Sequence, residues 1–400
     1  MPWRDTSAME ERYRFVMDAQ KDLGAFTELC ARYGVSTRIG YKWIRRHEEE
    51  GLTGLQNRSR APKNHPNEVS REVQEAILAV RRLHATWGPK KLRILLQKAD
   101  GSRSWPALST IGEVLKRNGL SVPRKHRRRA TPSSQPFAEC TEANRVWCAD
   151  YKGWFTTGDG QRCDPLTITD GFSRYLLRCQ AVDDLSYQVA QGVFEASFRE
   201  YGLPLAIRTD NGTPFASTGL GGLSRMSVWW LRLGIQLERI KPGKPQQNGR
   251  HERMHLTLKQ ETAQPPAQNA RAQQRRFDAF RAEYNHLRPH EAINMKTPAS
   301  LYQPSPRPYP SRVPEPQYGD GFEVRRVGDR GEFRWNGSKI FLSYALQDEL
   351  IGLRCCHDRY WEIYFGTLPV AILDCFRRQL LKPWQARRIK QALVPEEVQR

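Results

Sequence analysis

The sequence is poor in cysteine and has no long apolar run. Eight of its 400 residues are cysteine, and no two of them are spaced as Cys-x-x-Cys. A disulfide scaffold or a structural zinc site therefore has little support, and the composition favours reduced thiols in a cytosolic protein. No stretch approaches the roughly 18 consecutive apolar residues of a membrane-spanning helix, and the first residues lack the basic and apolar segments of a secretory signal. We therefore expect neither a membrane span nor a secretory signal.

Acidic residues are too few to balance the basic ones. The chain has 64 Lys and Arg against 43 Asp and Glu, a formal net charge of +21. Residues 1–130 hold 27 basic and 14 acidic side chains, so most of the surplus lies in the N-terminal third. Such a surplus favours a polyanionic partner, nucleic acid first, with a ribosome or a membrane surface as alternatives until motifs are considered. The asymmetry predicts a DNA-docking front attached to a part that does other work.

Two segments are too biased in composition to form a core. Residues 123–141 contain the run Arg-Lys-His-Arg-Arg-Arg and then a Pro- and Ser-rich stretch, so we expect an extended basic linker. This linker either grips phosphate or is a solvated tether. Residues 304–318 contain six prolines and predict a stiff polyproline-II spacer. These breaks divide the chain into parts at 1–55, 65–122, 142–303 and 319–386.

The front of the chain has the pattern of two helix-turn-helix units, at 1–55 and 65–122. In the first unit, the break Gly34-Val35-Ser36 separates two helices, and Tyr41 and Ile44 on the second are expected to face inward. In the second unit we expect three helices, the last opened by a capping box from Thr110 to Glu113. A basic second helix after a short turn is the geometry that enters the DNA major groove. The cations expected to contact DNA in these units and the basic linker are Arg38, Lys42, Arg45, Arg46, Lys116, Arg117, Arg127, Arg128 and Arg129.

The middle of the chain changes to strand periodicity. We expect strands at 145–155, 162–169 and 175–182, a helix at 187–201 and a further strand at 203–209, an order that predicts a mixed sheet flanked by helices. Asp150 lies inside the first, apolar strand, where a carboxylate is costly unless it is paired or binds a metal. Asp210 follows the last strand, in Asp210-Asn211-Gly212.

A third acidic residue begins a helix after a Pro- and Gly-rich loop. The segment from Pro242 runs Pro-Gly-Lys-Pro-Gln-Gln-Asn-Gly-Arg-His-Glu and includes Lys244 and Glu252. On the helix that follows, Glu252, His255 and Lys259 are spaced i, i+3 and i+7, which predicts that all three share one face. His255 either orients DNA or makes a structural hydrogen bond, and Lys244 and Lys259 are expected to contact DNA phosphate.

Together these motifs resemble the Asp-Asp-Glu core of retroviral integrases and of integrase-type bacterial insertion-sequence transposases. The carriers of the resemblance are the strand Asp150, the strand-end Asp210-Asn211-Gly212 and the Pro-Gln-x-x-Gly-x-x-Glu252 helix. The tandem helix-turn-helix front, with Tyr284-Asn-x-x-Arg-Pro-His290 and Thr297-Pro-Ala299, narrows it to the transposases. The zinc-binding domain of viral integrases has no counterpart here, and 41 residues separate Asp210 from Glu252, somewhat more than is common.

The resemblance implies a fold and a chemistry. It implies a multidomain chain with an all-α helix-turn-helix front and an α/β ribonuclease H-like catalytic core with a mixed sheet at 142–303. It also implies that Asp150, Asp210 and Glu252 are the catalytic, metal-binding carboxylates, with Asp150 bridging two Mg²⁺ or Mn²⁺ ions per active site. In-line cutting of a phosphodiester needs charge neutralised on the attacking and leaving oxygens, which two such ions achieve. Lys259 matches the family's basic residue near the reacting DNA end.

The tail at 319–386 has short alternating strands. Asn336-Gly337 between two apolar runs is a strong hairpin signal, and about five strands are enough for a small all-β barrel. This tail is similar to the DNA-binding barrel of integrases, although its modest charge leaves protein–protein assembly as an alternative.

The sequence as a whole predicts a DNA transposase. It would bind the terminal inverted repeats of its element, cleave DNA at the ends and transfer the 3′-hydroxyl strand into target DNA. Its partners would be double-stranded DNA and at least a second copy of the chain, since two ends must be joined, in the nucleoid of a bacterial cytoplasm. A DNA-binding regulator or domesticated inactive copy, and a plain nuclease of the same fold, are the alternatives.

Overall fold

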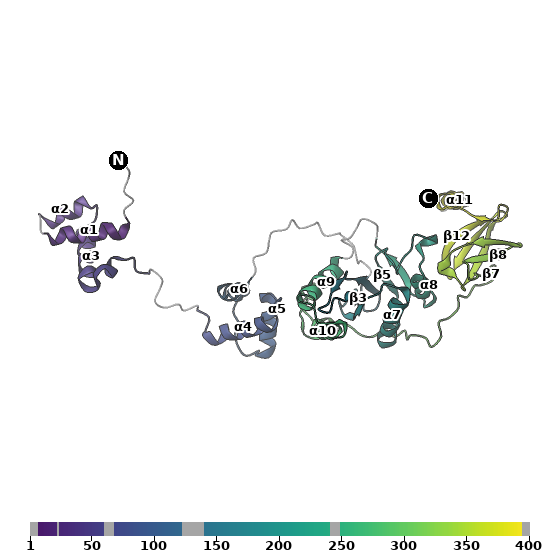
Figure 1. Ribbon diagram of the computed structural model, residues 1–400, viewed down its shortest axis with the longest axis horizontal. Coiled ribbons are helices and arrows are strands. Elements are labelled where there is room, and N and C mark those ends of the chain that lie inside the picture. The colour runs from purple at the N-terminus through teal and green to yellow at the C-terminus, as the bar shows by residue number, and fades with distance from the viewer. Residues whose placement is uncertain (1–6, 22–23, 60–67, 122–139, 241–248, 394–400) are drawn as a thin grey trace. The chain divides into compact units, whose positions relative to one another are not determined.

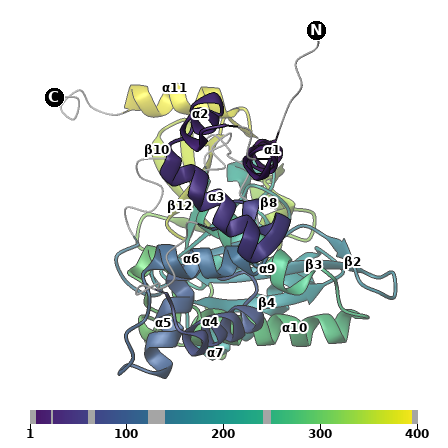
Figure 2. The same ribbon diagram turned by 90° about the vertical axis from the view of Figure 1, so that its left-hand side faces the viewer.

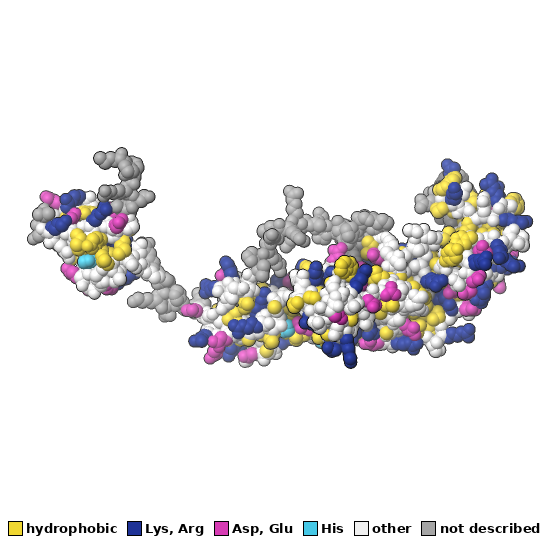
Figure 3. All heavy atoms as spheres, in the orientation of Figure 1, with side chains coloured by type: hydrophobic (Ala, Val, Ile, Leu, Met, Phe, Trp, Pro, Cys, Tyr) yellow, Lys and Arg dark blue, Asp and Glu magenta, His cyan; other side chains and the backbone are white. Residues whose placement is uncertain are grey.

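The computed structural model describes residues 7–21, 24–59, 68–121, 140–240 and 249–393. The chain divides into two compact units, Met1–Ser70 and Arg71–Arg400, and each is considered by itself (Figure 1). Among the described residues, no helix is both long and apolar enough to cross a membrane. On the face drawn in Figure 3, Lys and Arg side chains are spread over the helical parts and the C-terminal tail alike.

The first unit is a group of three helices around a small apolar core. The helices are α1 (Ala8–Gln20), α2 (Phe26–Arg32) and α3 (Thr37–Glu50), followed by the 3-10 helix η1 (Gly51–Leu55). Ser36 caps α3 by accepting a hydrogen bond from the backbone N–H of Ile39, as the break before this helix predicted. The core is formed by Phe15, Val16, Cys30 and Leu55.

Two side chains of α3 lie on the opposite side from the one expected. Tyr41 is 62% exposed rather than inward-facing, because Gly40 occupies the crossing with α1 and α2, beside the side chains of Phe15 and Cys30. Arg46 is only 7% exposed rather than solvent-facing, because η1 folds back along α3 and brings Gly54 against the Arg46 carbonyl. The Arg46 guanidinium lies 5.1 Å from the ring centre of Trp43.

Three more helices open the second unit. They are α4 (Arg71–Leu83), α5 (Pro89–Ala99) and α6 (Leu108–Arg117), packed around Ile77, Trp87, Leu92 and Ile111. The capping box expected at Thr110 is wrong, because α6 already begins at Leu108, after Ala107, which makes no side-chain cap. The earlier start follows from Trp105, which is buried and whose indole N–H donates to the carbonyl of Asp100 at 3.0 Å.

A mixed sheet forms the centre of the chain. Its strands and intervening helices are β1 (Val146–Tyr151), β2 (Phe155–Thr156), β3 (Arg162–Asp170), β4 (Leu176–Val182), α7 (Tyr187–Tyr201), β5 (Ala206–Thr209), η2 (Leu220–Gly222), α8 (Arg225–Arg232) and β6 (Gln236–Arg239). β1 pairs antiparallel with β3 and parallel with β5, and β5 pairs parallel with β6. The sheet is therefore mixed, as the order of the elements predicted.

Helices cover both faces of this sheet. Alternate residues of a strand point to opposite faces, so Trp147 and Ala149 face one side while Cys148 and Asp150 face the other. Trp147 and Ala149 join a core with α7 and α8. The opposite face packs against α9 (Gly249–Thr262) and α10 (Ala270–Ala282), which contribute Met254 and Phe277 to a second core.

Figure 2 shows α10 running beside β4. Polar side chains of α10 and of the π-helix η4 (Glu283–Leu287), which continues it, bond the backbone of β4 along its outer edge. Asn285 accepts from the Leu176 N–H at 2.8 Å and donates to the Leu176 carbonyl at 3.0 Å. Gln274 likewise bonds the Ala181 N–H and the Cys179 carbonyl. The Tyr-Asn-x-x-Arg segment thus has a structural role, since it satisfies backbone groups that an edge strand leaves open.

The tail is antiparallel. Its elements, after η5 (Glu291–Ile293) and η6 (Pro298–Ser300), are β7 (Glu323–Arg326), β8 (Glu332–Trp335), β9 (Ser338–Phe341), η7 (Tyr344–Leu346), β10 (Leu350–His357), β11 (Tyr360–Phe365), β12 (Leu368–Asp374), β13 (Gln379–Leu380) and α11 (Pro383–Leu393). Strands β13-β12-β11-β10-β7 form one sheet. Strands β8 and β9 form the hairpin expected around Asn336-Gly337, and closure into a barrel stays a prediction.

Two connecting segments bind the tail to the core. The proline-rich segment is extended but is not a free spacer, because the Arg307 guanidinium donates to the carbonyls of Pro204, Leu233 and Gly234. Leu223, from the long interval between Asp210 and Glu252, is buried in the apolar cluster of the tail. The extra length of that interval therefore serves as a packing surface for the tail.

Candidate active site

Asp150 lies on β1, and Asp210 directly follows the neighbouring parallel strand β5. In the β1–β5 pairing Val146 is opposite Ala206 and Cys148 is opposite Arg208, so each aspartate lies two residues beyond the last pair of this ladder. Adjacent strands are about 4.8 Å apart, and residues in register point to the same face. Asp150 is half-buried, whereas Asp210 is exposed and accepts a hydrogen bond from the Gly212 N–H at 3.1 Å.

The third carboxylate, Glu252, lies on α9. The three residues expected to share one face of this helix lie on two faces instead. The buried stripe of this helix is formed by His251, Met254, His255, Leu258 and Thr262. Glu252 and Lys259 are exposed and only about 20° apart around the helix, whereas His255 is turned toward the sheet. Spacing alone predicted one face for all three residues because it does not show how far the sheet covers the helix.

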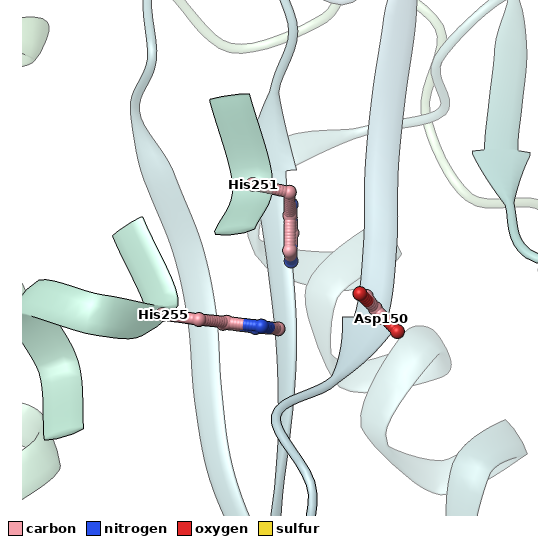
Figure 4. Close-up of side chains that lie close together, drawn as sticks. All are labelled: Asp150, His251 and His255. Carbon is pink, nitrogen blue, oxygen red and sulfur yellow. The ribbon is translucent and has the colours of Figure 1, made fainter. Parts of the chain in front are cut away.

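A buried polar centre joins α9 to the strand that carries Asp150. Figure 4 shows the imidazoles of His251 and His255 projecting from α9 toward the strands beside Asp150. The Oγ1 of Thr167, a fully buried side chain on β3, lies 2.7 Å from the Nε2 of each imidazole. The same hydroxyl donates to the backbone carbonyl of Asp150 at 3.1 Å. The sequence analysis did not single out His251 or Thr167. The i, i+4 spacing of the two histidines was the only pattern that could have pointed to His251.

The hydrogen bonds of this centre assign the protons. A hydroxyl has one proton to donate and two lone pairs that can accept. Thr167 can therefore donate to the Asp150 carbonyl and accept from both imidazoles, provided that each Nε2 carries its own proton. The Thr169 Oγ1 lies 3.2 Å from the Nδ1 of His251 and also donates to the Cys148 carbonyl. The bonds to Thr167 therefore make the Nε2 of both imidazoles a donor.

The electrostatics agree with that assignment. Burial lowers the pKa of His251 to about 3 and that of His255 to about 2, the second with added repulsion from His251 and Lys152. Burial also lowers the pKa of the half-buried Lys152, followed by repulsion from Lys259, while Asp150 opposes the shift. Lys152, which the sequence did not single out, therefore lies in the same electrostatic environment as Asp150 and Lys259.

We expect His255→Asn to make folding less sensitive to acid. A histidine whose pKa is depressed in the fold stabilises the protein above its unfolded pKa of about 6.5, and this contribution is lost as pH falls below that value, by about 1.4 kcal/mol per pH unit. Thermal unfolding at about pH 7.5 and about pH 5.5 measures the loss for wild type and variant. The wild type should lose more stability than the variant over this interval, and equal losses would contradict the buried neutral state of His255.

The donor atoms indicate which cation the site suits. Among the described residues, the His, Cys, Asp and Glu side chains that converge within 4.8 Å of one another are Asp150, His251 and His255. However, the Thr167 oxygen occupies the point toward which both Nε2 atoms are directed. Neither Asp210 nor Glu252 belongs to this group among the described residues. Carboxylate oxygens such as those of Asp150, Asp210 and Glu252 suit a hard cation such as Mg²⁺ or Mn²⁺.

The expected DNA-contacting residues divide into three groups. Those that the structure places on the surface are Arg38, Lys42, Arg45, Lys116, Arg117 and Lys259. Arg46 and His255 are buried, and His255 makes the structural hydrogen bond that was the alternative to a DNA contact. Arg127, Arg128, Arg129 and Lys244 lie outside the described residues.

Comparison with known families assigns the domains. Integrase core domain models match residues 141–245, which include Asp150 and Asp210, and residues 233–298, which include Glu252. A helix-turn-helix domain matches residues 11–63 and a homeodomain-like domain matches residues 39–115.

Curated relatives come from insertion elements. The chain is 25% identical over 243 residues, 60% of this chain and 83% of the relative, to an uncharacterized 31.7 kDa protein of insertion element IS407 from Burkholderia multivorans. It is 26% identical over 244 residues, 59% of this chain and 66% of the relative, to an uncharacterized 39.2 kDa protein of insertion element IS476 from Xanthomonas euvesicatoria. Together with the matched domains, these similarities support an insertion-sequence transposase of the integrase type.

The chain is also similar to viral proteins. It is 29% identical over 193 residues to the Gag-Pol polyprotein of baboon endogenous virus, 47% of this chain and 10% of that one. Among solved structures, the magnesium complex of the HTLV-2 integrase catalytic core domain matches at 16% identity and a TM-score of 0.33, over 41% of this chain and 99% of that chain. A simian T-cell lymphotropic virus intasome matches at 16% identity and a TM-score of 0.35, over 77% and 99%.

Proposed function

We propose that this transposase binds the terminal inverted repeats of its element, cleaves DNA at the ends and transfers the 3′-hydroxyl strand into target DNA. The observation that supports the proposal is the parallel pairing of β1 and β5, because Asp150 and Asp210 each lie two residues beyond its last pair, Cys148 and Arg208. Glu252, on the helix packed over Asp150, supplies the third carboxylate. Intact carboxylates at all three positions favour an active enzyme over a regulator that has kept only the fold.

The chemistry would be divided between anions and cations of the chain. Asp150, Asp210 and Glu252 would hold two Mg²⁺ or Mn²⁺ ions, which supply charge neutralisation at the reacting phosphodiester. Lys152, whose charge interacts with those of both Asp150 and Lys259, and Lys259 itself would hold the DNA phosphates around the cut. The exposed cations of α3 and α6 would dock the terminal repeats.

Two adjacent arginines of α3 test the docking surface. We expect Arg45→Ala to weaken binding of terminal-repeat DNA and to reduce the slope of log affinity against log salt by about 1, because an exposed guanidinium that contacts phosphate releases a counterion. Arg46→Ala should instead lower the stability of the first unit, because that side chain is buried against Trp43. Titrations of labelled duplex at several salt concentrations, with thermal unfolding of both variants, measure the difference. An unchanged salt slope for Arg45→Ala would remove α3 from the docking surface.

One assay distinguishes the proposed activity from its alternatives. Purified protein is incubated with Mg²⁺, a labelled terminal-repeat duplex and a target plasmid. Joined products support the transposase, nicks without joining support a plain nuclease, and a mobility shift without cleavage supports a regulator. Because two ends must be joined to one target, active complexes should contain at least two copies of the chain, which light scattering of the DNA complex measures.

A further inference from the structure

The buried centre around Thr167 lies beside the apolar packing of α9. Next to it, α9 packs Met254 and Leu258 against the sheet and α10. Burying three polar side chains in such a place is costly unless all their hydrogen bonds are made, and apolar residues of similar size would pack without that condition. The arrangement therefore calls for a reason beyond stability.

All the hydrogen bonds of this centre can form at only one rotation and height of α9 against the sheet. Both Nε2 atoms must come to 2.7 Å from a single oxygen, and that oxygen must also reach the Asp150 carbonyl. A displacement of α9 by one residue turns the helix by about 100° and moves it by about 1.5 Å, which would leave both imidazoles unpaired. The apolar contacts of Met254 and Leu258 are non-directional and would tolerate a smaller slip.

Glu252 is the immediate neighbour of His251 on the same helical turn. Its direction is therefore fixed by whatever fixes His251 and His255, and their common partner Thr167 is opposite Asp150 in the β1–β3 pairing. One hydroxyl thus connects the backbone of the first proposed metal ligand to the helix that carries the third.

We propose that Thr167, His251 and His255 are positioning residues that set the rotation and height of α9 against β1, and so the relation of Glu252 to Asp150. This inference rests on the proposed function of the two carboxylates. The three side chains act through the helix and the strand, not on DNA. Partners of this kind typically change metal affinity by about 10- to 100-fold when they are removed.

The test compares Thr167→Val, which keeps the shape and removes the hydroxyl, with Thr167→Ser, which keeps the hydroxyl. Binding of Mn²⁺ to the full chain without DNA is measured from the electron paramagnetic resonance signal of the free ion, and the Mg²⁺ midpoint is measured for terminal-repeat cleavage. We expect Thr167→Val to weaken Mn²⁺ binding and raise the Mg²⁺ midpoint by about tenfold or more, and Thr167→Ser to stay within about twofold of wild type. Thr262→Val removes a different buried hydroxyl, which lies on α9 and donates to the Leu258 carbonyl at 2.7 Å, and it should leave both midpoints unchanged.

Several outcomes would overturn the proposal. If Thr167→Val lowers the unfolding temperature but leaves both metal midpoints unchanged, the hydroxyl serves packing alone. If Thr167→Val does not fold, the test uses His255→Asn, which retains a side-chain donor, and His255→Leu, which does not. Equal metal midpoints for these two His255 variants would count against positioning. If Co²⁺ bound to the wild type gives an absorption band that His255→Gln abolishes, the imidazoles are ligands. Absence of cleavage in wild type, with Mn²⁺ binding still dependent on Thr167, would refute the proposed function and leave the positioning intact.

Discussion

Replacing Asp150 by Asn should reduce strand cleavage and joining by about 10³-fold or more and leave affinity for terminal-repeat DNA unchanged. The substitution keeps size and hydrogen-bonding capacity but removes the charge that the proposed metal ions require. Metal-based charge stabilisation at the transition state is worth several kcal/mol, and about 1.4 kcal/mol corresponds to tenfold in rate. Binding should survive because the docking cations lie on α3 and α6, far from Asp150 in the sequence. Single-turnover cleavage and a mobility-shift titration of the same preparation measure the two effects.

The matched control is Asp183→Asn. Asp183 follows β4, is exposed and has no place in the proposed site, so its replacement removes the same charge without touching the reaction. Asp210→Asn and Glu252→Gln should behave as Asp150→Asn does. Full joining activity in Asp150→Asn would refute the assignment, whereas a parallel loss of activity in Asp183→Asn would point to a general effect of charge.

Much of this site could be predicted from sequence because each carboxylate stands out locally. Asp150 interrupts an apolar strand, Asp210 ends the next parallel strand, and Glu252 begins a helix after a Pro- and Gly-rich loop. Period-2 and period-3.6 patterns also gave the order of strands and helices in the core, since each element buries one well-defined face. The relation between the elements is then constrained by ordinary sheet pairing.

The remaining features depend on contacts between distant segments. His251 and Thr167 are 84 residues apart, and no periodicity connects a threonine in one strand with an imidazole on a later helix. Arg46 was expected on the surface because its helix reads as amphipathic, yet the five residues of η1 fold back over it. The role of the long interval before Glu252 likewise became clear only from Leu223 in the core of the tail.

The Asn285 side chain should be worth more to stability than its size suggests. It is 2% exposed and bonds both backbone groups of Leu176, on a strand that pairs with β3 alone among the described strands. Asn285→Ala leaves a buried N–H and a buried carbonyl without partners, at about 1–3 kcal/mol each. The expected loss is about 2–5 kcal/mol, or a fall of roughly 5–15 °C in unfolding temperature for a domain of this size. Calorimetry of the full chain, with the transition of the core followed by tryptophan fluorescence, measures it.

A substitution of Gln274 separates the effect of burial on stability from the effect of the hydrogen bonds themselves. Its amide also makes two bonds to β4, to the Ala181 N–H and the Cys179 carbonyl, but it is only half-buried. Water can replace the lost partners there, so Gln274→Ala should cost about 1 kcal/mol, the usual net value of a hydrogen bond. If both substitutions cost the same, desolvation of the backbone is not what makes Asn285 important. If Asn285→Ala is the more costly and its unfolding is accompanied by aggregation, then the amide also protects β4 from pairing with other chains, because an uncovered edge strand offers its free N–H and carbonyl groups to any neighbour.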